Sequence, residues 1–96
     1  MSPKNKKKLN IQRKKLDILD KKLLNIIKTR TQIIKRVILL KTNRKEIVDK
    51  KRIAFILRKI KKASIKKKID PKITLKIWKS MIWSYIDFER KNFKDK

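Results

Sequence analysis

The sequence contains no cysteine, no histidine and no glycine, and it has only two prolines among its 96 residues. Without cysteine and histidine there can be no disulfide, no Cys/His zinc site, no thiol nucleophile and no imidazole acid–base chemistry. Without glycine, tight hairpin turns and glycine-rich phosphate loops have almost nothing to be built from. Any catalysis must therefore use Lys, Arg, Asp, Glu, Ser or Tyr, and we expect neither a metal nor a cofactor.

Long apolar runs are missing as well. No run approaches the roughly 18 residues that cross a bilayer, and no signal-peptide core follows the basic start of the chain. These features predict a soluble, cytoplasmic protein that does not enter a membrane.

Positive charge is present in large excess. Lys and Arg number 33 against 8 Asp and Glu, which gives a net charge of +25 at pH 7. Such a field concentrates polyanions and invites a nucleic-acid or anionic-membrane interpretation. A coding bias that fills solvated positions with lysine fits the enrichment in Lys, Ile and Asn equally well, so total charge alone does not decide the function.

Apolar periodicity predicts three helices. Between about residues 9 and 40, apolar residues recur at three- and four-residue steps, as in an amphipathic helix: Leu16, Leu19, Leu23, Ile26, Ile27, Ile33, Ile34 and Val37. Residues 1–8 form a basic leader that we expect to be frayed, ahead of a single domain over 9–96. A loop over 41–48 separates this first helix from a second one.

The second helix is predicted over about 49–64, with Ile53, Ile56, Leu57 and Ile60 facing inward. The third begins at Asp70 and Pro71, a capping residue followed by proline at the first helical position, and runs to about Phe93. The first helix is too long for the remaining chain to cover. We therefore expect an all-α protomer of a long, a short and a medium helix, in a helical bundle that a second copy completes.

Charged residues interrupt two of these apolar faces. Arg30 and Lys41 project into the centre of the first arc, and Glu89 falls inside the third, which otherwise carries Ile73, Ile77, Trp78, Met81, Ile82, Tyr85, Ile86, Phe88 and Phe93. A buried unpaired carboxylate costs several kcal/mol, so we expect an ion pair of Glu89 with Arg30 or Lys41. Arg30 could also extend its guanidinium to the surface, and Lys41 could already belong to the loop.

Two further charged residues bracket the start of the second predicted helix. Asp49 suits the capping position, and Arg52 could be an ordinary surface residue. Together with Arg30, Lys41 and Glu89, however, they converge on a small helical core. The sequence thus predicts a partly buried site for a small anionic substrate.

The order of these residues resembles the all-helical class of chorismate mutases. The matching positions run in order through nearly the whole chain: Arg13, Leu16, Leu19-Asp20, Leu23-Leu24, Arg30, Lys41, Val48-Asp49, Arg52, Asp70-Pro71, Tyr85 and Glu89. The resemblance implies a homodimer whose long first helices are intertwined. It also implies the conversion of chorismate to prephenate in phenylalanine and tyrosine biosynthesis.

The resemblance implies a role for each cation. Arg13 matches the arginine that crosses into the site of the partner subunit, and Arg30 matches the one that grips a substrate carboxylate. Lys41 matches the lysine that binds both a carboxylate and the ether oxygen of chorismate. Arg52 matches a further arginine of the site.

The resemblance is less complete at the remaining positions. Glu89 falls where the family carries Gln or Glu facing the ether oxygen, and Tyr85 falls where many members have a small hydroxyl residue near the ring carboxylate. Ile53 stands where the family usually has a glutamate that holds the substrate hydroxyl. Ile53 and the Trp83 to Ile86 stretch are similar to isochorismate pyruvate lyases, whereas Asp49 could take over hydroxyl binding.

Three alternatives to a mutase remain at this point. One is an isochorismate pyruvate lyase. Another is a small basic nucleic-acid binder with Trp78, Trp83 and Tyr85 as stacking groups, although the apolar arc favours core packing for these aromatics and makes nucleic acid the less favoured partner. The third is a purely structural dimer of the same fold.

Overall fold

The computed structural model describes residues 1–94, and in this part of the chain all regular structure is helical. The elements are α1 (Pro3–Leu40), a short 3-10 helix η1 (Arg44–Glu46), α2 (Lys50–Lys66) and α3 (Pro71–Asn92). The expected all-α order of a long, a short and a medium helix is confirmed. The described chain forms two units, residues 1–33 and residues 34 onward, and each is considered by itself.

The first unit consists of the N-terminal part of α1, which begins at Pro3 rather than near residue 9. Ser2 caps this end: the Asn5 backbone N–H donates to Ser2 Oγ at 3.2 Å, and the Lys6 N–H donates to the Ser2 carbonyl at 2.9 Å. Proline suits the first helical position because its missing N–H would have no partner there. Residues 3–8, expected to be frayed, therefore belong to the helix, while the domain division at residue 9 stays a prediction.

The side chains of the apolar face predicted for α1 are exposed to solvent in the first unit. Leu16, Leu19, Leu23 and Ile26 are between 53% and 64% exposed. Exposure of so many large aliphatic side chains on one stripe is unusual for a protein surface and is typical of interaction faces.

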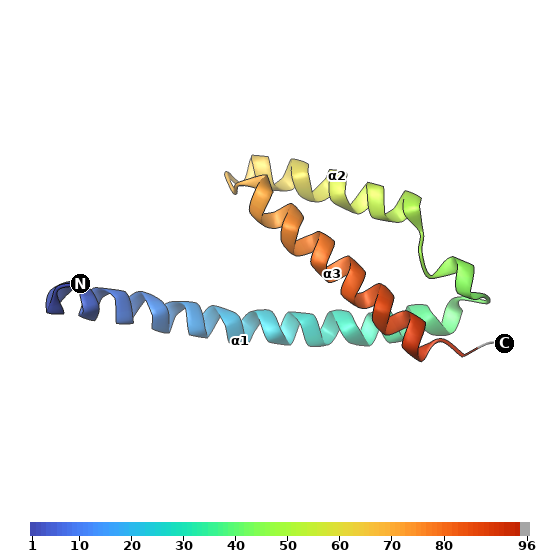
Figure 1. Cartoon of the computed structure of the whole chain (residues 1–96), viewed down its shortest axis with the longest axis horizontal. Coiled ribbons are helices and arrows are strands. Elements are labelled where there is room, and N and C mark those ends of the chain that lie inside the picture. Colours follow the sequence, from blue (N-terminus) through green and yellow to red (C-terminus); the bar gives the residue numbers. More distant parts are fainter. Residues whose placement is uncertain (95–96) are drawn as a thin grey trace. The chain divides into compact units, whose positions relative to one another are not determined.

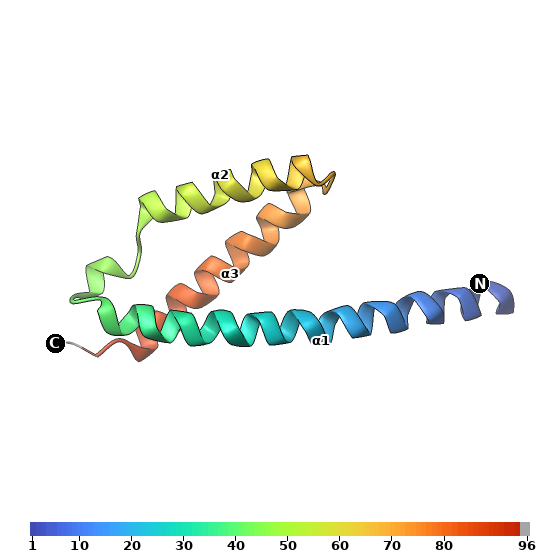
Figure 2. The same cartoon turned by 180° about the vertical axis from the view of Figure 1, so that it is seen from behind.

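The second unit contains the end of α1, η1, and an antiparallel hairpin of α2 and α3, which pack against each other (Figures 1 and 2). Both starts of the hairpin helices are capped as predicted. Asp49 Oδ1 accepts from the Arg52 N–H at 3.0 Å, and Asp70 Oδ1 accepts from the Lys72 N–H at 2.9 Å. Pro71 opens α3, also as predicted.

The turn between α2 and α3 places a lysine in the left-handed region, since Lys68 has a φ of 59°. The Lys68 N–H donates to the Ile65 carbonyl at 3.1 Å, and the Ile69 N–H donates to the Ser64 carbonyl at 2.9 Å. This pair of bonds is the Schellman motif, which glycine usually completes because it has no Cβ to clash.

We expect Lys68→Gly to stabilise the fold by roughly 0.5–1 kcal/mol, because it removes the left-handed strain of a residue with a Cβ. The measurement is the thermal unfolding midpoint. Lys67→Gly is the matched control. Lys67 has a φ of −87°, which is unstrained, so glycine at this position only adds backbone entropy to the unfolded chain. An equal shift for both variants would contradict this explanation.

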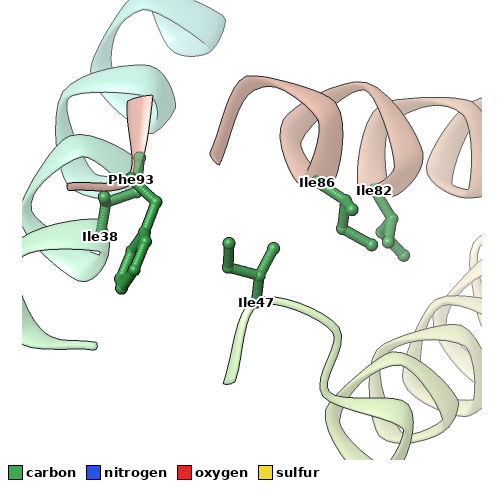
Figure 3. Packing of buried hydrophobic residues seen from close by; sticks show 5 residues of the cluster. All are labelled: Ile38, Ile47, Ile82, Ile86 and Phe93. Atoms are coloured by element: carbon green, nitrogen blue, oxygen red, sulfur yellow. The ribbon is translucent and has the colours of Figure 1, made fainter. Parts of the chain in front are cut away.

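A small core joins the elements of the second unit. Its buried members are Ile38, Ile47, Ile82, Ile86 and Phe93. Figure 3 shows that they come from the end of α1, the loop after η1, α3, and the residue that follows α3. The predicted inward residues Ile53, Ile56 and Leu57 are half-buried and pack against this cluster. Within the hairpin, the buried Ser64 Oγ lies 2.6 Å from Thr74 Oγ1.

The predicted apolar arc of α3 is only partly buried. Ile82, Ile86 and Glu89 are buried, whereas Ile73 and Ile77 are more than half exposed. Trp83, for which core packing was favoured, is 49% exposed. The reason is that the described part of the second unit has too few apolar side chains to cover the whole arc. The apolar face of α1 is left exposed in the same way.

Candidate active site

An ion pair between Lys41 and Glu89 lies at the centre of the candidate site. Lys41 Nζ is 3.1 Å from Glu89 Oε1 and 3.3 Å from Oε2, so the ammonium bridges both carboxylate oxygens. The two side chains are 19% and 6% exposed. A carboxylate this buried needs a cation, because removing it from water unpaired is costly. The predicted ion pair of Glu89 is therefore confirmed, with Lys41 as its partner.

Lys41 lies one residue beyond the end of α1 rather than on the helix, so the loop alternative was correct for its position. Its backbone N–H still donates to the Ile38 carbonyl at 3.2 Å, and the side chain stays half-buried. The lysine is thus held by the last turn of the helix without being part of it.

Arg44 connects the loop to the end of α3. Its Nη1 donates to the Arg90 carbonyl at 3.1 Å, and its guanidinium carbon lies 5.4 Å from the centre of the Phe93 ring. The Phe93 N–H donates in turn to the Glu89 carbonyl at 2.8 Å. Arg44 therefore fixes the helix end that carries Glu89. Arg44 was not predicted as a site residue, because a helical pattern contains no relation between a side chain and a carbonyl 46 positions away.

The loop after Lys41 is held by its own polar side chains. The Glu46 carboxylate accepts hydrogen bonds from the Thr42 hydroxyl, from the Thr42 N–H at 3.3 Å and from Asn43 Nδ2 at 3.1 Å. The Thr42 hydroxyl bond and, more weakly, the Lys41 charge lower the pKa of Glu46. The stabilisation from these contacts is therefore present at neutral pH and is lost as the pH falls through the lowered pKa.

A hollow of about 470 Å³ lies next to Lys41. It is lined by Lys41, Lys45, Glu46, Val48, Asp49, Lys50 and Lys51. The hollow is largely open to solvent, and its volume is within the range of small-molecule sites. The hollow brings two predicted site residues together, Lys41 and Asp49, although one oxygen of Asp49 also caps α2.

The other predicted site residues lie as follows. Tyr85 is half-buried on α3, and Arg52 is exposed, with its guanidinium carbon 5.4 Å from the centre of the Phe55 ring. Arg13 is exposed and Arg30 is half-buried, both on the part of α1 that forms the first unit. Within the second unit, the structure thus assembles Lys41, Glu89 and Asp49.

No group of three or more His, Cys, Asp or Glu side chains among residues 1–94 is placed to hold a metal ion. Nor does any helix in this part of the chain have the length and apolar character needed to span a membrane.

The fold and the site define a small helical protein with a mostly buried lysine–glutamate pair beside a lysine-lined hollow, an arrangement suited to a small anionic ligand. Residues 12–90 match the family model of chorismate mutase type II, and the chain belongs to this family. Membership implies an isomerase. No curated protein and no solved structure matches the chain.

Proposed function

We propose that this protein is a chorismate mutase, which converts chorismate to prephenate in the cytoplasm as a step of phenylalanine and tyrosine biosynthesis. The observation that carries the proposal is the mostly buried pair of Lys41 and Glu89 beside the hollow. The reaction is an intramolecular rearrangement in which the ether C–O bond breaks as a C–C bond forms. It needs no nucleophile and no cofactor, which suits a chain without cysteine and histidine.

In this proposal, Lys41 and Glu89 act on the ether oxygen, where negative charge develops in the transition state. Donors already placed at that position stabilise the charge without reorganisation. Lys41 donates to Glu89 in the substrate-free site, so in this proposal the pair opens when the substrate binds. Lys41 then donates its ammonium to the ether oxygen, while Glu89 donates only when it carries a proton, since an ionised carboxylate would repel the oxygen.

The remaining residues hold the flexible dianion in its compact reactive conformation. Arg30 and Arg52 bind carboxylates, because a guanidinium forms two parallel bonds with a carboxylate group. Asp49 accepts from the substrate hydroxyl, and Tyr85 lies near the ring carboxylate. Positioning of this kind can supply a large part of the rate enhancement of a one-substrate rearrangement.

A direct assay tests the proposal. Purified protein is expected to consume chorismate and form prephenate, and Arg30→Ala is expected to lower kcat/KM by roughly 10², the effect of losing a bidentate carboxylate contact. Arg36→Ala removes the same charge from an exposed position of α1 and should stay within about twofold of the wild type. Absence of prephenate formation by the wild type would disprove the mutase proposal.

A second candidate is isochorismate pyruvate lyase, and Ile53 is the observation that favours it. Ile53 is half-buried against the core cluster, so this position offers no carboxylate to the substrate hydroxyl. Parallel incubations with chorismate and with isochorismate, in which prephenate and pyruvate are measured, separate the two activities. A higher kcat/KM for pyruvate release would replace the mutase by the lyase.

We also propose that the working form is a homodimer intertwined through α1. The exposed stripe of Leu16, Leu19, Leu23 and Ile26 supports this, because burying it removes a large apolar area from water. The double variant Leu19→Lys/Leu23→Lys is expected to sediment as a monomer. It should also have no activity in the chorismate assay. Asn25→Lys/Gln32→Lys adds the same charges away from the stripe and should leave the dimer intact; dissociation of both variants alike would count against the stripe.

Arg13 is proposed to act in the site of the partner subunit, and mixed dimers test this. A site then takes Arg13 from one chain and Arg30 from the other, so a dimer of one Arg13→Ala chain and one Arg30→Ala chain has one intact site. After random exchange of subunits, we expect the mixture to regain about a quarter of wild-type activity. No gain over the separate variants would place Arg13 and Arg30 in the same chain's site.

A further inference from the structure

The hollow beside Lys41 carries an excess of lysines that the proposed chemistry does not use. Its lining has four ammonium groups, of Lys41, Lys45, Lys50 and Lys51, against the two carboxylates of Glu46 and Asp49. Three of these lysines have no assigned role in the reaction. They are all exposed, so their charged groups reach solvent at the edge of the hollow.

Both carboxylates of the hollow already accept hydrogen bonds, Asp49 with only one of its two oxygens. Glu46 accepts from Thr42 and Asn43 within the loop, and Asp49 accepts from the Arg52 N–H at the start of α2. An incoming anion therefore meets carboxylates that are tied to the backbone and to neighbouring side chains. The lysine side chains, in contrast, can move towards a ligand on their flexible stems.

The position of two of these lysines is unfavourable for the helix that carries them. Lys50 and Lys51 are the first two residues of α2, and the first turn of this helix contains no acidic residue. The N-terminus of a helix bears partial positive charge, so cations there are destabilising and anions are stabilising. The same field attracts a bound anion. The helix N-terminus and the lysine charges both contribute to this attraction.

We propose that Lys45, Lys50 and Lys51 form a capture site, which draws the dianionic substrate into the hollow before one end of it reaches Lys41. This inference rests on the proposed function and extends it to the binding step. Attraction between a dianion and three nearby cations is appreciable in water at low ionic strength, and salt screens it over about 10 Å at 0.1 M. The capture site therefore acts on KM and on the salt dependence, not on the bond rearrangement.

The test compares two triple variants with the same change in net charge. Lys45→Gln/Lys50→Gln/Lys51→Gln removes the capture site, whereas Lys72→Gln/Lys76→Gln/Lys79→Gln removes three exposed lysines from the start of α3. At low ionic strength we expect the first variant to lose roughly three- to tenfold in kcat/KM for chorismate, mostly through KM, and the second to stay within about twofold. Near 1 M salt, where the screening length is about 3 Å, the difference should disappear.

Stability gives a second measurement. Because Gln at the first positions of α2 removes an unfavourable charge, the capture-site variant should unfold at a temperature no lower than that of the wild type. If the triple variant does not fold, Lys45→Gln alone should still lower kcat/KM by about twofold at low salt. Equal kinetic effects of the two triple variants, or none, would overturn the capture site, whereas a wild type that does not convert chorismate would refute the proposed function itself.

Discussion

Lys41→Met is expected to lower kcat/KM for chorismate by roughly 10²–10³, the usual cost of removing one donor to an oxygen on which charge develops. Lys41 is the cation of the mostly buried pair and also lines the hollow, so no other described group has the same position. The loss should fall on kcat as well as on KM, because the contact with the ether oxygen strengthens in the transition state.

The same variant leaves Glu89 buried without its ammonium partner. Breaking one side of a buried pair destabilises a protein by about 3–5 kcal/mol, so Lys41→Met should also unfold at a lower temperature. Lys41→Met/Glu89→Gln removes the stranded charge and separates the two effects. We expect the double variant to recover much of the stability but not the activity; recovery of both would show that Lys41 acts only through folding.

Glu89→Gln is expected to change the shape of the pH profile. If a protonated Glu89 donates to the ether oxygen, wild-type kcat falls as the pH rises, because an ionised carboxylate has no proton to donate. Activity of the wild type should therefore rise towards acidic pH, while the Gln variant, which always has an N–H to donate, should give a flat profile. The measurement is kcat against pH for both proteins.

Glu46→Gln is the control for that experiment, since it neutralises a carboxylate that also lies beside Lys41. Its hydrogen bonds are to the loop, so the variant should keep the wild-type slope of kcat against pH. An unchanged profile for Glu89→Gln would remove Glu89 from hydrogen bonding to the ether oxygen.

The sequence was most informative where a local rule determines the structure. Asp49 and the Asp70-Pro71 pair predicted the starts of α2 and α3, because a capping side chain and its helix are adjacent in the chain. Glu89 on an apolar arc predicted a buried ion pair, because an unpaired carboxylate is too costly there. The two candidates for its partner could be separated only by the structure.

Other features depend on contacts that no periodic pattern contains. The Ser2-Pro3 dipeptide is a helix-start signal, and Ser2 caps α1 in the structure. The high lysine content of residues 1–8 instead led to the prediction of a frayed leader. The stacking of Arg44 on Phe93 joins the loop to the far end of α3, and it required three-dimensional information. The contribution of Arg13 involves a second chain in our proposal, so a single sequence could suggest it only through the family resemblance.

Lys41 and Glu89 are 48 residues apart in the sequence, whereas Ser64 and Thr74 in the hairpin are separated by 10. The entropic cost of closing a chain grows with the logarithm of its length, so the hairpin closes more readily than the segment that ends in the ion pair. Folding should therefore build the α2–α3 hairpin early and join the end of α1 to the end of α3 late. A nascent or partly unfolded chain can hold its hairpin and still lack the Lys41–Glu89 pair. If the pair is catalytic, as we propose, activity can appear only after this late contact has formed.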